Sequence, residues 1–362
     1  MAIEEGLNQS KLNCTTRLFP IADGGDGTGS LIVKSCHGAI IKKEVKDPLG
    51  RKITSQFGLI EDGPTAIIEM ADASGLRLLK KDELNPLKAS SFGTGALIKS
   101  ALAEGAKRII IAMGGSATVD GGCGILSALG IAFRDANGNG LAAYPEALIN
   151  MVSVDASGLD ERISSCEIVI LCDVNNKLLG PDGAAAVFGP QKGASAEDVP
   201  VLESFLKKFA EISLAQTGKD MTAIKHGGAA GGATAGLYTW INAKLENGID
   251  YFLELTKFDQ ALARADVVIT GEGSIDRQTL QGKGPYGVAV QAKKAGLKVI
   301  GVAGLIPPEP DDELGIYFNE LICINEPGVD LATAMANTRE NLIKIGKEIG
   351  NRLALNSTSS IK

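Results

Sequence analysis

Residues 266–303 read DVVITGEGSIDRQTLQGKGPYGVAVQAKKAGLKVIGVA and contain the clearest fold signal of the chain. Inside the runs Asp266–Thr270 and Lys298–Ala303 the residues are continuously apolar and do not alternate with polar ones, which is typical of parallel strands covered on both faces. Gly287–Lys294 lies between them and has a helical pattern. Strand, helix and strand in this order predict a right-handed βαβ unit.

The same strand–helix rhythm extends along the chain, and apolar or β-branched runs predict further strands at Arg108–Ala112, Glu167–Leu171 and Leu321–Ile324. Residues 40–70 differ, because short alternating runs separated by turn residues predict antiparallel strands there. Leu331–Leu355 has apolar residues at helical spacing and predicts one long amphipathic helix.

The chain length indicates more than one domain. It has 362 residues, whereas single hydrophobic cores stop growing near about 250–300 residues. We expect an α/β protein in which residues 1–38 and 263–362 form a Rossmann-like parallel-sheet domain. Residues 39–262 would form an inserted mixed α/β domain, with a ligand cleft between the two domains.

Composition excludes several functional classes. The net charge is −7 without a lysine or arginine run, which argues against nucleic-acid binding. No apolar run is long enough to predict a membrane helix or a signal peptide. The six cysteines form no C-x-x-C pair and there are only two histidines, which argues against a zinc site and favours a reduced, cytoplasmic protein.

Glycine is abundant, with 45 residues, and gathers in loops that also carry charged or hydroxyl side chains. Several of these loops follow predicted strands, where open α/β sheets bind ligands and where backbone N–H groups can face an anion. Neither the Walker A pattern nor the G-x-G-x-x-G pattern is present. The loops are 22–28 (ADGGDGT), 113–122 (MGGSATVDGG), 172–176 (CDVNN) with 188–194 (FGPQKGA), 227–232 (GGAAGG) and 270–285 (TGEGSIDRQTLQGKGP).

Phosphoryl transfer needs carboxylates for Mg²⁺, cations for the developing charge and a group that orients the attacking hydroxyl. The loops offer Lys192 and Lys283 as cations, each flanked by glycine. A loop aspartate can equally be a turn or helix-capping residue, and either lysine can be a surface residue. The acidic candidates are Asp23, Asp26, Asp120, Asp173, Glu272 and Asp276.

Nine motifs in order resemble the bacterial glycerate kinase family of the glycerate 2-kinase type over nearly the whole chain. The resemblance implies a transferase that uses ATP and Mg²⁺ to phosphorylate D-glycerate to 2-phosphoglycerate, and it allows a homodimer. The motifs are ADGGDGT at 22–28, DPLGR at 47–51, EMADASGL at 69–76, SFGTG at 91–95, GGSATVDGG at 114–122, CDVNN at 172–176, FGPQKGA at 188–194, GAAGG at 228–232 and GEGSIDRQTLQGK at 271–283.

From this resemblance we expect the following roles for the loop residues. Asp173, Lys192 and Lys283 are the predicted catalytic residues, with Asp173 orienting the glycerate hydroxyl. Candidate metal ligands are Asp23, Asp26, Glu272 and Asp276, and candidate nucleotide-binding residues are Gly114, Gly115, Ser116, Thr118, Gly271, Gly273, Gln278 and Thr279.

The chain departs from the family pattern at its start. Family members usually open with a strand and a Pro-Asp-Ser-Phe-Lys segment, whereas Met1–Leu7 resembles the back half of the following helix. Asp26 stands where the family usually has glutamate, and Lys177 stands where it often has proline. Two alternatives therefore stay open: an inactive protein that binds glycerate or nucleotide, and a kinase of another small hydroxy acid.

Overall fold

The computed structural model describes residues 1–61, 63–308 and 312–359, which divide into two compact units. A terminal unit combines Met1–Ile21 with Leu253–Lys362, and a central unit spans Ala22–Phe252. Both units are of the α/β type, as the sequence predicts. Residues 22–38 were expected in the terminal domain but belong to the central unit, because helix α2 (Thr28–Ser35) packs against central strands. Residues 253–262 were expected in the inserted domain but belong to the terminal unit.

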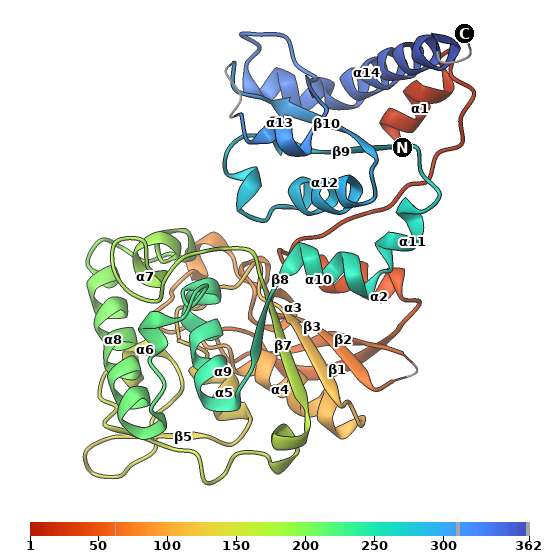
Figure 1. The fold of residues 1–362 in the computed structure, drawn as a ribbon. Coiled ribbons are helices and arrows are strands. Elements are labelled where there is room, and N and C mark those ends of the chain that lie inside the picture. Colours follow the sequence, from red (N-terminus) through yellow and green to blue (C-terminus); the bar gives the residue numbers. More distant parts are fainter. Residues whose placement is uncertain (62, 309–311, 360–362) are drawn as a thin grey trace. The chain divides into compact units, whose positions relative to one another are not determined.

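The central unit is built around a mixed sheet with the strand order β1-β2-β3-β4-β7-β8 (Figure 1). The first three strands pair antiparallel, as predicted for residues 40–70, and the pairs from β3 to β8 are parallel. A separate antiparallel pair joins β5 to β6. The strands are β1 (Ala39–Lys46), β2 (Lys52–Ile60), β3 (Thr65–Glu69), β4 (Arg108–Ala112), β5 (Ala132–Arg134), β6 (Ser153–Asp155), β7 (Glu167–Cys172) and β8 (Lys244–Asn247).

Helices cover the central sheet and create its core. All residues of β3 are buried, which explains why this strand is apolar on both faces. Helices α2 and α4 both pack against β2 and β3. With α2, the helices are α3 (Met70–Ser74), α4 (Phe92–Ala103), α5 (Cys123–Ala128), α6 (Pro145–Leu148), α7 (Ala184–Phe188), α8 (Asp198–Thr217), α9 (Ala233–Ile241) and α10 (Gly248–Leu255), which extends past Phe252.

The terminal unit contains a parallel sheet with the order β11-β10-β9. Strands β9 (Val267–Ser274) and β10 (Lys298–Leu305) flank helix α12 (Gly284–Lys294) and form the predicted βαβ unit, and β11 (Glu320–Cys323) lies on the other side of β10. The remaining helices are α1 (Ala2–Asn8), α11 (Phe258–Leu262), α13 (Leu314–Tyr317) and α14 (Leu331–Ser359). No helix among the described residues is long and apolar enough to cross a membrane.

The end of β9 corrects one expectation. Gly271, Glu272 and Gly273 were expected in a loop after the strand, but they continue the strand because Ser274 still pairs with Leu305 of β10. The loop that carries Asp276 therefore starts later than the sequence pattern suggests.

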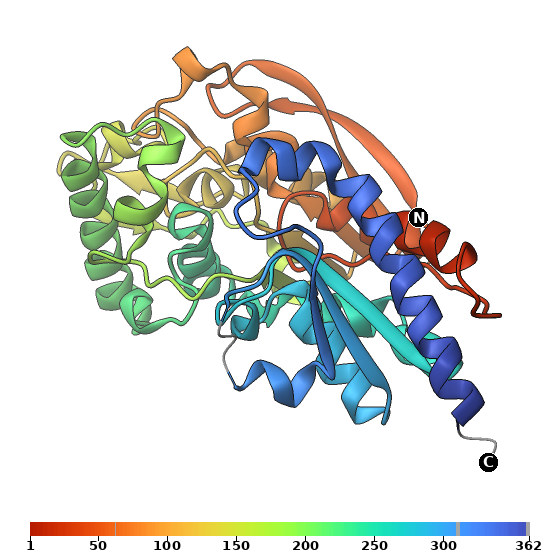
Figure 2. The same cartoon turned by 90° about the horizontal axis from the view of Figure 1, so that it is seen from above.

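Both chain segments of the terminal unit meet where α1 packs against α14 (Figure 2). A Cβ atom on Gly6 would lie 2.1 Å from the carbonyl oxygen of Ile343, and one on Gly346 would lie 2.4 Å from that of Ile3. Glycine at these two positions lets the helix backbones approach closely. The contact buries Leu7 together with Ile345 and Ile349.

Candidate functional site

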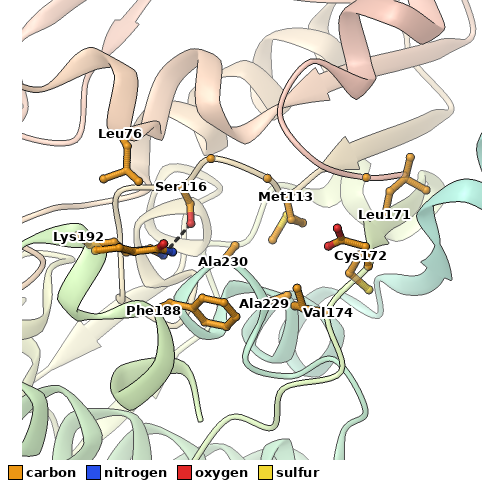
Figure 3. Close-up of a pocket in the computed structure, with 15 residues that line it drawn as sticks. Leu76, Met113, Ser116, Leu171, Cys172, Val174, Phe188, Lys192, Ala229 and Ala230 are labelled. Atoms are coloured by element: carbon orange, nitrogen blue, oxygen red, sulfur yellow. Dashed lines mark hydrogen bonds between the residues drawn. The ribbon is translucent and has the colours of Figure 1, made fainter. Parts of the chain in front are cut away.

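A cavity of about 160 Å³ lies in the central unit next to the carboxyl ends of β4 and β7 (Figure 3). This is the edge at which parallel strands present ligand-binding loops. The cavity is mainly apolar, but a lysine, an aspartate, a serine and a glutamine also line it. Its lining residues are Gly24, Leu76, Met113, Gly114, Gly115, Ser116, Leu171, Cys172, Asp173, Val174, Phe188, Gln191, Lys192, Ala229 and Ala230.

Lys192 is the buried cation of this cavity, with an exposed fraction of only 2%. It ends the short 3-10 turn Pro190–Lys192, and its Nζ donates to Ser116 Oγ at 2.8 Å and to the carbonyl oxygen of Thr118 at 2.7 Å (Figure 3). Burial lowers the pKa of Lys192 to about 7, and the nearby charge of Asp120 opposes this shift. The side chain is therefore a buried amine whose charge responds to pH and to an incoming anion.

Asp120 has a structural role. It is fully buried, and its carboxylate accepts hydrogen bonds from the backbone N–H groups of Ser91, Gly122 and Gly124 and from the Ser91 hydroxyl. These bonds connect the start of α4 to the start of α5 and hold the loop that carries Ser116. Because Asp120 does not line the cavity, we interpret it as the support of the glycine loop.

Two of the predicted glycine loops pack directly against each other at the cavity. A Cβ atom on Gly114 would lie 2.4 Å from the backbone nitrogen of Asp26 and 2.6 Å from Gly25 Cα, so only glycine fits there. The carboxylate of Glu69, at the end of β3, accepts hydrogen bonds from the N–H groups of Gly27 (2.9 Å) and Ser30 (2.6 Å). Glu69 thereby fixes the loop at residues 23–28 to the start of α2.

The charged residues beside this loop form an ion-pair cluster that the sequence analysis missed. Arg77 Nη1 donates to Asp26 Oδ1 at 3.1 Å, and Arg77 Nη2 donates to Asp72 Oδ1. Burial raises the pKa of Asp72 to about 6, with a further contribution from the charge of Glu69 and opposition from Arg77. The signal was available in the sequence, because Glu69 and Asp72 lie inside the motif EMADASGL at 69–76 and Arg77 directly follows it.

The other predicted residues of the central unit occupy distinct positions. Asp173 directly follows β7 and lines the cavity with Gly114, Gly115 and Ser116. Thr118 does not line it, but its carbonyl oxygen holds Lys192. Asp23 accepts a hydrogen bond from the N–H of Gly25 at 3.3 Å, a turn interaction that its flanking glycines favour.

A second group of predicted residues gathers in the terminal unit between β9 and α12. Glu272 Oε1 accepts a hydrogen bond from Thr279 Oγ1 at 2.7 Å, and Lys283 Nζ lies 4.0 Å from Glu272 Oε2. Asp276 accepts hydrogen bonds from Ser274 Oγ at 3.0 Å and from the N–H of Gln278 at 2.7 Å. The residues predicted to act together thus form one cluster in each unit. Among the described residues, no three His, Cys, Asp or Glu side chains converge as a metal centre.

Comparisons with known proteins show the family of the chain. The sequence profile of the glycerate kinase family matches residues 1–354. The chain belongs to the glycerate kinase family. It is 42% identical to a glycerate kinase of Bacillus subtilis, over 99% of this chain and 94% of that protein. It is 38% identical to the glycerate 2-kinase of Escherichia coli, over 98% of this chain and 93% of that protein.

A solved structure confirms the fold of this glycerate kinase family member. The crystal structure of a glycerate kinase 2 from Salmonella typhimurium LT2 superposes with a TM-score of 0.82 at 40% sequence identity. The match covers 99% of this chain and 94% of that chain. The chemistry of the family is that of a kinase, and the alternative of an inactive binding protein is not favoured by these relatives.

Proposed function

We propose that the protein transfers the γ-phosphoryl group of ATP to a hydroxyl of D-glycerate and forms 2-phosphoglycerate, with Mg²⁺ as the metal ion. The observation that carries this proposal is Lys192, a buried cation in a small cavity formed by glycine loops. A volume of about 160 Å³ suits a three-carbon acid but not a whole nucleotide, because pockets for larger ligands measure about 300–1,000 Å³. We therefore assign this cavity to glycerate and the transferred phosphoryl group.

Each lining residue has a role in this proposal. Lys192 binds an anionic oxygen of the substrate, because a desolvated ammonium interacts strongly with a negative charge. The loop at Gly114, Gly115 and Ser116 offers backbone N–H groups and a hydroxyl to the phosphoryl oxygens. Asp173 orients the attacking hydroxyl and accepts its proton.

The donor groups also fit a magnesium nucleotide. Asp26 is a half-exposed carboxylate beside Gly115, and carboxylate oxygens are the ligands that Mg²⁺ prefers. We propose Asp23 and Asp26 in the central unit, and separately Glu272 and Asp276 in the terminal unit, as candidate ligands of Mg²⁺, which when bound would supply positive charge to the phosphate oxygens. Around the terminal pair, the proposed nucleotide-binding residues are Gly271, Gly273, Gln278 and Thr279, and Lys283, whose Nζ lies 4.0 Å from Glu272 Oε2, is the proposed catalytic cation.

An assay of ADP release with D-glycerate, ATP and Mg²⁺ tests the proposal, and ³¹P NMR of the product distinguishes 2- from 3-phosphoglycerate. We expect turnover with D-glycerate to exceed that with other small hydroxy acids, and the product to be the 2-phosphate. Turnover only with another hydroxy acid would show that this acid, and not D-glycerate, is the substrate. No turnover with any of these acids would refute the kinase proposal for this chain. A cytoplasmic location and a homodimer stay predictions that fractionation and sedimentation would check.

Asp173→Asn is expected to lower kcat by about 10²–10⁴-fold, because the amide cannot accept the proton of the substrate hydroxyl. The KM for D-glycerate should change much less, since the isosteric side chain preserves the shape of the cavity. Steady-state kinetics with a thermal melt would check this. A fall in kcat that merely follows a loss of folded protein would argue against a catalytic role.

Lys283→Ala is expected to reduce turnover by at least about 10²-fold without unfolding the protein, because the side chain is half-exposed and its ion pair with Glu272 is long. Lys298→Ala is a matched control, since Lys298 has the same exposed fraction of 38% and a comparable ion pair with Glu320 in the same unit. Steady-state kinetics of Lys283→Ala and Lys298→Ala would measure the difference in turnover. Equal, small effects of the two substitutions would remove Lys283 from the catalytic residues.

A further inference from the structure

Arg77 connects two carboxylates at the rim of the cavity. It follows Leu76, a lining residue, and the N–H of Leu76 donates to the carbonyl oxygen of Gly115 at 2.9 Å. The guanidinium group donates to Asp26 with one terminal nitrogen and to Asp72 with the other. Arg77 is therefore attached to the glycine loop through its backbone neighbour and to the loop at residues 23–28 through its side chain.

The bond from Arg77 fixes which oxygen of Asp26 faces the glycine loop. Oδ1 of Asp26 accepts from Arg77, whereas a Cβ atom built on Gly115 would lie 3.4 Å from Oδ2 and 3.3 Å from Cγ. Gly115 lines the cavity, so Oδ2 is the oxygen next to the loop that we assign to the phosphoryl group. The side chain of Asp26 is 47% exposed and is accessible to a metal ion.

Arg77 is the residue that holds the side chain of Asp26, whereas other contacts hold only its backbone. Its backbone is already held, because Gly114 packs against the Asp26 nitrogen and Glu69 binds the N–H groups of Gly27 and Ser30. Asp72 has a side-chain exposure of only 13%, compared with 47% for Arg77, and gives the guanidinium a fixed attachment. The planar guanidinium can bridge two carboxylates with a defined geometry, which a lysine ammonium cannot reproduce.

We infer that Arg77 is a positioning residue that orients the Asp26 carboxylate for a divalent cation, with Asp72 as its anchor. The inference rests on the proposed function, in which Asp26 is a ligand of the metal ion. Partners that orient metal ligands typically contribute about 10–100-fold to metal affinity or activity. The positive charge of Arg77 by itself repels a cation, so its removal would raise the metal affinity if only electrostatics mattered. Loss of the orienting contact would instead lower the metal affinity, and the direction of the measured change therefore distinguishes the two effects.

The experiment measures binding of Mn²⁺ to the full chain in the presence of ADP, by the loss of the free Mn²⁺ signal in electron paramagnetic resonance. This readout does not require turnover. The variants are Arg77→Met, Arg77→Lys and Asp26→Asn. Arg51→Met is the matched control, since Arg51 has the same exposed fraction of 47% and also bridges two carboxylates, Asp47 and Glu83, without lining the cavity.

We expect Mn²⁺ affinity to fall by about tenfold or more in Arg77→Met and in Asp26→Asn, to recover partly in Arg77→Lys, and to stay unchanged in Arg51→Met. The kcat of Arg77→Met should fall more than its KM for D-glycerate rises. Unchanged or tighter Mn²⁺ binding by folded Arg77→Met would overturn the inference, and so would wild-type affinity in Asp26→Asn. If Arg77→Met does not fold, a loss of affinity in Arg77→Lys supports the inference and wild-type affinity overturns it.

The same data distinguish a failure of this inference from a failure of the proposed function. A protein that loses Mn²⁺ affinity in Arg77→Met but never phosphorylates D-glycerate would keep the positioning role and refute the proposed substrate. A protein that phosphorylates D-glycerate with unchanged Mn²⁺ affinity in Arg77→Met would keep the proposed function and refute the positioning role.

Discussion

Lys192→Met is expected to reduce kcat/KM for D-glycerate by at least about 10²–10³-fold while leaving the folded protein as stable as the wild type, or more stable, at neutral pH. The loss of activity follows because the cavity loses its buried cation. The gain in stability follows because a desolvated ammonium is costly, and a methionine of similar length fills the same space. Replacing buried ion pairs by apolar side chains often stabilises a protein, and we expect the same direction here.

The low pKa of Lys192 determines how the stability of the wild type changes with pH. The folded-state pKa of Lys192 is about 7, below the ordinary value of 10.5, so between these pH values the unfolded chain binds the extra proton. Stability of the wild type must therefore rise with pH through this window, and the full penalty is present below about pH 7. In Lys192→Met this contribution to the pH dependence of the free energy of unfolding disappears. The variant is therefore expected to exceed the wild type in stability by the largest amount at low pH.

Denaturant titrations from pH 6 to pH 10 would measure this difference. Lys208→Met is a control, because Lys208 lies in the same unit and donates to the carbonyl oxygen of Ile149 at an exposed position. We expect Lys208→Met to keep the slope and the activity of the wild type. A Lys192→Met variant with normal kinetics, or with the wild-type slope, would contradict the role given to this residue.

Gly114→Ala is expected to destabilise the protein by about 1–3 kcal/mol and to lower kcat by about 10²-fold. The new methyl group would stand 2.4 Å from the backbone nitrogen of Asp26, so the two glycine loops have to move apart. This displacement shifts the Asp26 carboxylate away from Gly115. It also changes the wall of the cavity, which Gly114 and Gly115 line. Backbone atoms form the obstacle, and they cannot move aside as a flexible side chain would.

Gly140→Ala in the same unit is the matched control, because a Cβ atom there would meet no atom within 4 Å. Chemical denaturation and steady-state kinetics of both variants measure the effect. If Gly114→Ala were as active and as stable as Gly140→Ala, the close packing of the two loops would not be needed for function.

Local sequence was sufficient to predict the buried parallel strands and one part of the site. Residues 109–112 are apolar because β4 lies between neighbouring strands with both faces covered, and the predicted limits of 108–112 agree with the structure. The glycine loops after β4 and β7 were also predictable, since the ends of parallel strands meet at one edge. This is why Gly114, Ser116 and Asp173 line one cavity.

Features that depend on distant partners were not predictable in this way. Strand β8 has the polar sequence KLEN and exists because it pairs with β7. The burial of Lys192 depends on Ser116, which lies 76 residues earlier in the chain. Arg77 looks like an ordinary surface residue until the fold brings Asp26 to it across 51 residues. Hydrophobic periodicity contains no information on such pairings.

The close contact between α1 and α14 has a consequence for biosynthesis. Ile3 and Leu7 are translated before the central unit, but their partners Ile345 and Ile349 are translated only after it. The strands β1 to β8 are complete by Asn247, so the central unit can fold on the nascent chain while α1 still exposes its apolar residues. The terminal unit can therefore be completed only after the central unit has been translated, because its assembly has to wait for translation of α14.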